Sequence, residues 1–186
     1  MEIQGEYLIA GPRERVWDAL NDVDILRECI PGCESLERVS DSELQAVVMA
    51  AIGPVKARFN TKITLENLRP PESYTMVGES KGGAAGFGRG TATVTLTESV
   101  DSTELHYSAD FRVGGKLAQV GSRLVLGATR KIADDFFGSF SRKLDAGAVR
   151  VEVHGGAGRQ PAPASRTWLA IGAALLVLLI WWFLLR

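Results

Sequence analysis

The sequence has few of the residues on which metal binding and acid–base catalysis usually depend. Its 186 residues include two cysteines, Cys29 and Cys33, and two histidines, His106 and His154. The cysteines flank a Pro-Gly turn in the segment CIPGC, and the histidines lie far from them in the sequence. A structural zinc site needs about four ligands. We therefore predict no metal site and interpret the two cysteines as small side chains around a turn.

The sequence also lacks a signal peptide and an excess of one charge. The opening segment MEIQGEYLIAG has no basic region, no apolar region and no small-residue cleavage site. We therefore expect the soluble part to stay on the cytoplasmic side, where disulfides are disfavoured. The net charge is −1 and the charged residues are scattered, whereas nucleic-acid binding requires a clustered basic face. We exclude nucleic acid as a partner.

Two glycine-containing segments resemble catalytic motifs but lack the required context. GESKG at 78–82 matches Gly-x-Ser-x-Gly, but the nucleophile Ser80 would need a helix after it. GGAAGFGRG at 82–90 is followed by neither a helix nor a Gly-Lys-Ser/Thr sequence, which phosphate binding requires. Residues 82–90 are expected to form either a hairpin bulge or a mobile flap. We predict no catalytic residue.

One long apolar run stands at the C-terminus. Trp168–Leu185 contains no charged or polar uncharged residue, and as a helix it would be about 27 Å long. Trp168 at one end, and Trp181 and Trp182 near the other, suit the headgroup level of a bilayer. The run predicts a transmembrane anchor at 167–186.

The rest of the chain predicts an α+β domain. Residues 2–10 alternate as a strand, two short helical segments follow, and about six further strands alternate between apolar and polar residues. The period then becomes helical. The predicted apolar stripe of this last helix consists of Leu117, Val120, Leu124, Ala128, Ile132, Phe136, Phe140 and Leu144.

A long helix lying across a curved antiparallel sheet is the helix-grip architecture, which leaves an apolar cavity between helix and sheet. The predicted cavity residues are Val48, Phe59, Met76, Phe87, Tyr107, Phe111, Val120, Leu124 and Phe136. The predicted cavity mouth consists of Gly53, Pro54, Gly86, Gly88 and Gly114. Inward side chains of this kind also form ordinary filled cores, so both interpretations stay open. We divide the chain into a helix-grip domain (1–144), a Gly/Ala/Pro-rich flexible linker (145–166) and the membrane anchor (167–186).

Four segments resemble a known family. They are GPRERVWDALND, LRECIPGCESLE, GPVKARF and GSRLVLGATRKIADDFFGSFSRKL. They resemble the CoxG family of carbon monoxide dehydrogenase subunits, which belongs to the START-like, or polyketide-cyclase (SRPBCC), superfamily, over residues 1–144. The resemblance implies a START-like fold and a non-catalytic accessory protein. It also implies a partner, a molybdenum-containing CO dehydrogenase or a related oxidoreductase at the cytoplasmic membrane.

Together the residues and the resemblance predict a membrane-tethered protein that binds a hydrophobic ligand. The expected ligand is a quinone, such as menaquinone, or another lipid, held without a covalent bond. The protein would recruit the oxidoreductase to the membrane and shuttle quinone to it. A docking adaptor without a ligand and a polyketide-cyclase-like enzyme are the alternatives.

Overall fold

The computed structural model describes residues 1–146, which all belong to one compact unit. Most of the predicted linker and the whole predicted anchor, with Trp168, Trp181 and Trp182, lie outside these residues, so both stay predictions. No helix within residues 1–146 is both long and apolar enough to cross a bilayer.

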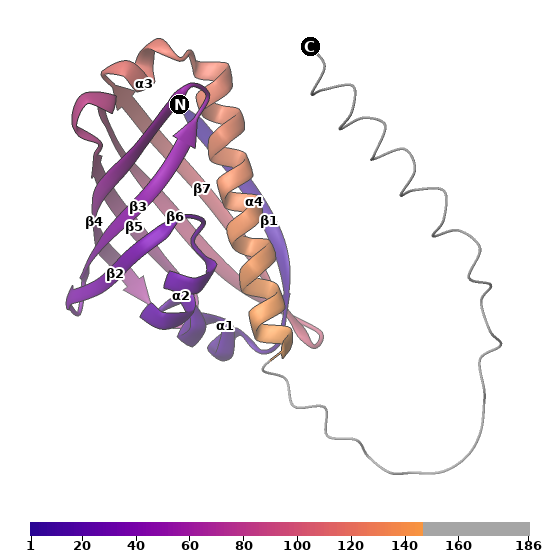
Figure 1. Ribbon diagram of the computed structural model, residues 1–186. Helices are drawn as coiled ribbons and strands as arrows, with labels where there is room; N and C mark the ends of the chain where they lie inside the picture. Colours follow the sequence, from indigo (N-terminus) through magenta and orange to yellow (C-terminus); the bar gives the residue numbers. More distant parts are fainter. Residues whose placement is uncertain (147–186) are drawn as a thin grey trace, which may run out of the picture. The chain divides into compact units, whose positions relative to one another are not determined.

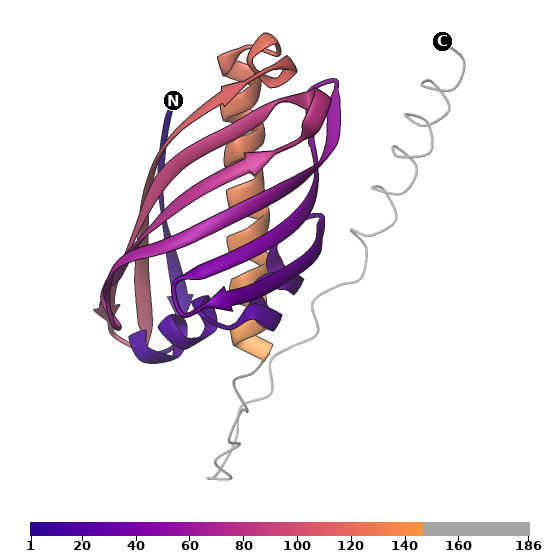
Figure 2. The same ribbon diagram turned by 90° about the vertical axis from the view of Figure 1, so that its left-hand side faces the viewer.

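Seven strands form one antiparallel sheet in the order β1-β7-β6-β5-β4-β3-β2. They are β1 (Glu2–Ala10), β2 (Cys33–Ser40), β3 (Glu43–Ile52), β4 (Val55–Arg69), β5 (Ser73–Lys81), β6 (Phe87–Ser99) and β7 (Ser102–Gly114). Figure 1 shows the first strand completing one edge of the sheet beside β7, and Figure 2 looks onto the outer face of the sheet.

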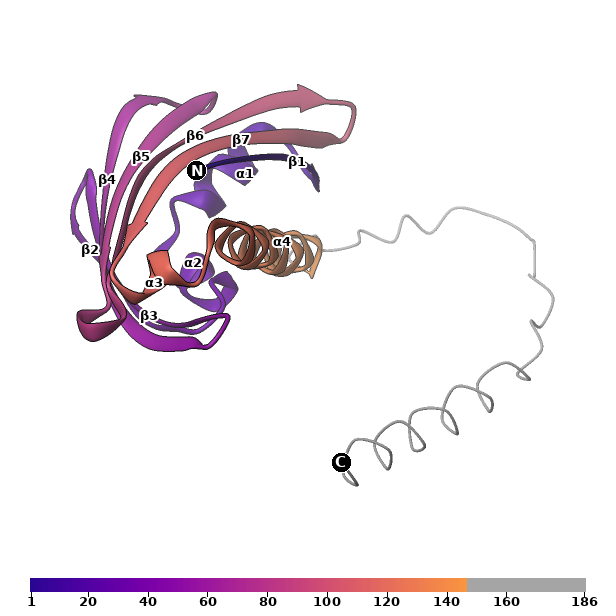
Figure 3. The same ribbon diagram turned by 90° about the horizontal axis from the view of Figure 1, so that it is seen from above.

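Four α-helices and a short 3-10 turn complete the domain. They are α1 (Arg13–Leu20), α2 (Val23–Cys29), η1 (Gly83–Ala85), α3 (Lys116–Gln119) and α4 (Ser122–Ala146). Seen from above, the sheet curves around α4 (Figure 3). The structure thus confirms the predicted α+β fold, with a curved antiparallel sheet and a long C-terminal helix.

The alternation of side chains along each strand decides which residues face α4. In β4, Phe59 and Leu65 are buried on the concave face, whereas Arg58 and Lys62 lie on the solvent side. Arg58 pairs there with Glu34 at 2.6 Å. The apolar concave face is therefore the surface that α4 covers.

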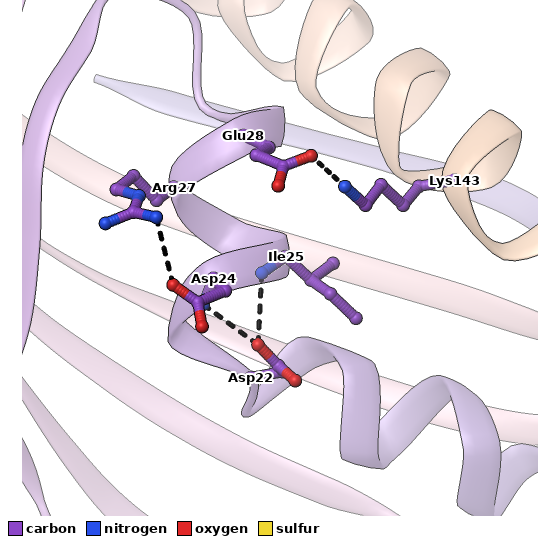
Figure 4. A network of polar contacts seen from close by, with 6 residues as sticks. All are labelled: Asp22, Asp24, Ile25, Arg27, Glu28 and Lys143. Atoms are coloured by element: carbon purple, nitrogen blue, oxygen red, sulfur yellow. Dashed lines mark hydrogen bonds and ion pairs between the residues drawn. The ribbon is translucent and has the colours of Figure 1, made fainter.

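Helix α2 packs against the C-terminal part of α4. It begins at the cap residue Asp22, whose Oδ1 accepts hydrogen bonds from the backbone N–H groups of Asp24 (2.9 Å) and Ile25 (3.1 Å). On its other side Glu28 pairs with Lys143 of α4 (Figure 4). The capped helix thus bridges the sheet and α4.

The CIPGC turn packs directly against the backbone of β3. Gly32 has a φ of +73°, and its carbonyl accepts a hydrogen bond from the Met49 backbone N–H at 2.8 Å. A Cβ at Gly32 would lie 2.2 Å from the Met49 carbonyl oxygen, so the position requires glycine. Cys29 and Cys33 are free thiols, and burial raises the pKa of both.

The predicted apolar stripe of the long helix is wrong in part, because the helix is interrupted. Gly121, with a φ of +94°, separates α3 from α4 and changes the helical phase. Val125 is consequently the inward residue, with 1% of its surface exposed, whereas Leu124 is 56% exposed. Ile132 is also exposed, while Phe140 and Leu144 are buried as expected.

Candidate functional site

The space between α4 and the sheet is not completely filled. A hollow of about 350 Å³, which we call the central hollow, lies against strands β4 to β7, β1 and Thr129 of α4. A second space of about 200 Å³, the inner pocket, lies closer to α2 and is bordered by Tyr74, Phe136 and Phe137. Ile63 and Met76 line both. The two spaces therefore adjoin each other.

Small residues on the sheet create the central hollow. Gly78 of β5 and Gly90 of β6 are register partners on the concave face, and Ile63 of β4 is the next partner in the row. A Cβ built on Gly78 would meet no atom within 4 Å. Ala92 and Ala109 continue this floor of small side chains. The hollow thus exists where the strands carry no side chain long enough to reach α4.

One hydroxyl pair lies on this otherwise apolar face. Thr61 Oγ1 and Ser80 Oγ are 2.7 Å apart on neighbouring strands. Each hydroxyl partly satisfies the other, and the pair keeps one O–H for a further acceptor. Ser80 is followed by η1 and a strand and not by a helix, so the structure confirms that GESKG is not a nucleophile elbow.

The inner pocket is apolar except near three polar side chains. Tyr74 is 6% exposed, and its ring meets Trp17 edge-on at a centroid distance of 5.5 Å. Burial raises the pKa of the Tyr74 hydroxyl, so it stays protonated at neutral pH. Asn21 and Arg38 also border this pocket.

An aromatic stack fixes α4 to the β1 edge of the sheet. The Tyr7 ring lies 4.2 Å from Phe137, and Tyr107 lies 5.7 Å from Phe137, measured between centroids. Tyr7 Oη donates a 2.7 Å hydrogen bond to Asp134 of α4. Burial and this carboxylate raise the pKa of Tyr7. Tyr107 therefore belongs to a packing stack and borders neither the central hollow nor the inner pocket.

The other predicted cavity residues divide into three groups. Met76 lines both spaces, Phe111 the central hollow and Phe136 the inner pocket. Phe59 instead joins Ala85 and Leu117 in a separate cluster near η1. Val48 is half-buried against the main core, and Val120 is half-buried between α3 and α4.

Two predicted cavity residues point to solvent. Leu124 does so because of the phase change at Gly121. Phe87 is 38% exposed, and the Arg89 guanidinium lies 5.3 Å from its ring centroid. Since Gly88 and Gly90 occupy the concave positions of β6, the larger side chains that alternate with them face outward.

The residues predicted to form the cavity mouth lie in different surroundings in the structure. Gly86 and Gly114 meet through their backbones, because a Cβ on Gly86 would lie 2.0 Å from the Gly114 carbonyl oxygen. Gly82 N–H bonds to the Gly86 carbonyl at 2.8 Å, which makes the 82–90 segment a closed hairpin connection. Gly88 is half-buried in β6 beyond it. Gly86 and Gly114 are therefore in backbone contact, whereas Gly88 lines the central hollow.

Gly53 and Pro54 are exposed in the β3–β4 turn beside the start of α4. A Cβ on Gly53 would lie 3.1 Å from Val120 Cγ1 and 3.8 Å from Leu124 Cδ1. Next to them, the inward residues of upper β3 remain only half-buried. The β3–α4 seam, as we call this strip, consists of Val48, Ala50 and Ile52 of β3 together with Val120 and Leu124.

Five further residues border the two spaces but were not predicted from the sequence: Ile63, Gly78, Ser80, Thr129 and Tyr74. The available signal was the alternation of β5, in which Tyr74, Met76, Gly78 and Ser80 share one face. Within residues 1–146, no group of three or more His, Cys, Asp or Glu side chains could hold a metal ion.

Comparison with known proteins places this geometry in a wider group. Residues 5–145 match the family model that describes CoxG, a subunit of carbon monoxide dehydrogenase. A conserved protein from Geobacillus kaustophilus is 30% identical, with a TM-score of 0.74, and the match covers 78% of this chain and 96% of that one. No curated protein matches the chain.

Two more distant structures share the fold. A START superfamily protein from Mycobacterium smegmatis is 12% identical, with a TM-score of 0.61 and coverage of 78% and 97% of the two chains. The ZhuI aromatase/cyclase from Streptomyces sp. R1128 is 13% identical, with a TM-score of 0.60 and coverage of 84% and 99%. The fold is START-like.

Proposed function

The chain belongs to the CoxG family of carbon monoxide dehydrogenase subunits, and from this premise we propose that it is an accessory protein that binds a hydrophobic ligand between α4 and the sheet. The proposed ligand is a quinone of the bilayer, such as menaquinone. The proposed partner is a molybdenum-containing CO dehydrogenase or a related oxidoreductase, which the protein would recruit to the membrane and supply with quinone.

The observation that carries the proposal is the apolar hollow above Gly78. Transfer of an isoprenoid tail into water costs about 0.8 kcal/mol for each exposed methylene. A protein that encloses part of the tail lowers this barrier. The β3–α4 seam supports the proposal because half-covered apolar side chains there, including Leu124 and Ile52, would give a lipid a route to the interior.

The charge distribution supports an approach of this end to a membrane. The basic end, as we call it, carries five exposed cations near the β3–β4 turn, η1 and α3: Lys56, Arg89, Arg112, Lys116 and Arg123. None of them forms an ion pair with another residue of the described range 1–146. Each cation near an anionic bilayer surface contributes about 1 kcal/mol of attraction.

The predicted linker and anchor complete the proposed arrangement. The 22 residues of 145–166 would span about 25 Å as a flexible chain and considerably more when extended. An anchored domain would therefore stay close to the bilayer and retain the freedom to turn its basic end toward the membrane. The tether would also keep its effective concentration near the membrane high.

The test fills the hollow without disturbing the fold. Gly78→Leu adds a side chain into open space, and loss of a strand glycine should keep or raise the unfolding temperature. The matched control is Val77→Leu, at the neighbouring outward position. The full chain of each variant is purified from membranes, and its lipids are extracted and identified by mass spectrometry.

We expect quinone with the wild-type chain and with Val77→Leu, and at least a tenfold loss with Gly78→Leu. If the wild-type chain carries no quinone, or Gly78→Leu carries as much, the ligand-binding function is wrong. Recruitment of the dehydrogenase without a ligand would then favour the docking adaptor. Turnover of an aromatic or polyketide substrate, abolished by Tyr107→Phe, would favour an enzyme.

A further inference from the structure

The inner pocket contains one buried hydrogen-bond donor without an acceptor. Tyr74 projects from β5 into the concave side, and its side chain borders the pocket together with Phe136 and Phe137 of α4. No other group within residues 1–146 forms a hydrogen bond with Tyr74 Oη. Nevertheless Tyr74 is 94% buried, since only 6% of its surface is exposed.

The Tyr74 hydroxyl is not sealed inside the core. Arg13 Nε is the single side-chain polar atom of residues 1–146 that is both fully enclosed and without a hydrogen-bond partner. Tyr74 Oη also has no partner, but it does not belong to this fully enclosed class. Part of the surface of this oxygen is therefore accessible. Because the side chain borders the inner pocket, we assign this free surface to the pocket.

A ligand that enters the pocket and displaces water from the Tyr74 hydroxyl must offer it an acceptor, because a hydroxyl left unpaired there typically costs about 1–3 kcal/mol. Tyrosine side chains in protein interiors usually satisfy their O–H group. Phenylalanine would supply the same ring contact with Trp17 at this position without that cost. A ligand with a carbonyl oxygen in the adjoining pocket would give the Tyr74 hydroxyl such an acceptor, whereas a pure hydrocarbon would not.

The other two polar side chains that border the inner pocket, Asn21 and Arg38, already donate to backbone carbonyls. Asn21 Nδ2 donates to the Trp17 carbonyl at 2.9 Å. Arg38 donates to the carbonyls of Asn21 at 2.8 Å and Asp41 at 3.2 Å. Beside the central hollow, the Thr61 and Ser80 hydroxyls bind each other and keep one O–H free, but this pair does not border the inner pocket. Tyr74 is thus the uncommitted donor in the inner pocket.

We propose that the inner pocket binds the carbonyl-bearing ring of the ligand and that Tyr74 Oη donates a hydrogen bond to its carbonyl oxygen. This inference rests on the proposed function and assigns the orientation of the ligand. The ring lies among Tyr74, Phe136 and Phe137. The apolar tail passes Ile63 and Met76 into the central hollow, since these two residues border both spaces.

The protonation state of Tyr74 agrees with this role. Burial raises the pKa of its hydroxyl, so the group remains an O–H donor throughout the physiological pH range. A neutral donor suits a neutral carbonyl oxygen, because no ionic group has to be desolvated with it. The pocket therefore favours a quinone or a similar ketone over a purely hydrocarbon lipid.

The test compares two probes that differ only in their carbonyl groups: a decyl-substituted 1,4-naphthoquinone and the corresponding decylnaphthalene. Tyr74→Phe should weaken binding of the quinone about tenfold and leave binding of the hydrocarbon unchanged. Tyr107→Phe is the matched control and should change neither, since Tyr107 borders neither space. The infrared carbonyl stretch of bound quinone should move to higher frequency in Tyr74→Phe only.

Equal affinity of Tyr74→Phe and wild type for the quinone, with no change in the carbonyl stretch, would overturn the assignment of the ring site while leaving the proposed function intact. Equal weakening of both probes would also overturn it, because it would indicate a packing effect. If neither probe binds the wild-type chain, the proposed function fails together with the inference. Thermal unfolding should show Tyr74→Phe at least as stable as wild type, which excludes misfolding as the cause.

Discussion

At the scale of single residues, glycines decide where the backbone can come close to other atoms and where space is left. Gly32 lets the CIPGC turn bind β3, and Gly78 leaves the central hollow open. The two positions look alike in the sequence, but their surroundings are opposite. At Gly32 an added Cβ would meet the Met49 carbonyl, and at Gly78 it would meet no atom within 4 Å.

Gly32→Ala is therefore expected to destabilise the domain by about 3 kcal/mol or more, since strain at positive φ adds to a backbone collision. Gly83→Ala is the matched control: Gly83 also has positive φ (+56°), but an added Cβ would meet no atom within 4 Å. It should cost about 1–2 kcal/mol. Urea unfolding of both variants measures the difference, and equal losses would show that the Gly32–Met49 contact is unimportant.

At the scale of elements, the interruption at Gly121 determines which face of α4 meets the sheet. An uninterrupted helix from 116 to 144 would place Leu124 inward in line with Leu117. The change of phase instead buries Val125 and leaves Leu124 beside the β3–β4 turn, on the β3–α4 seam. A residue expected in the core thus becomes part of the proposed route for the ligand.

Val125→Ala should lower the free energy of unfolding by about 2 kcal/mol, because it opens a space in the core. Leu124→Ala should change it by less than about 0.5 kcal/mol. Chemical denaturation distinguishes the two, and the reverse order would mean that the uninterrupted helix is correct. Leu124→Ala should nevertheless alter the rate of quinone uptake, if the seam is the route.

At the scale of the whole domain, charge is distributed unevenly although the chain is almost neutral. The unpaired cations of the basic end lie near the proposed opening. At the other end of the strands, Arg69 and Glu72 lie at the β4–β5 connection and Glu98 near the end of β6, so acidic residues outnumber basic ones there. Orientation at an anionic bilayer would therefore place the basic end toward the lipid.

The double variant Lys116→Glu, Arg123→Glu should slow quinone uptake from vesicles containing anionic lipid several-fold at low salt. The effect should shrink as salt screens the charges. Arg69→Glu changes charge at the opposite end and should have little effect. A transfer assay with neutral vesicles should show no difference among the variants, and equal slowing by Arg69→Glu would argue against an oriented approach.

Much of the architecture could be predicted from periodicity. The alternation in residues 2–10, 56–66 and 104–113 predicted strands, and the helical period after residue 116 predicted the covering helix. The site was predicted less well. Met76, Phe111 and Phe136 border the two spaces, but Phe87 and Leu124 point outward. Phe87 lies on the outward face of the regular alternation of β6, and the helix break at Gly121 turns Leu124 away from the sheet.

The sequence by itself determined the order of the elements and the polarity of each strand face, because both depend on neighbours two to four residues apart. It also carried the family motifs. Only the tertiary structure decided where space remains, since a hollow depends on which residues of separate strands align. Gly78 and Gly90 become one floor only through strand register, and Tyr74 lacks an acceptor only because of what packs around it.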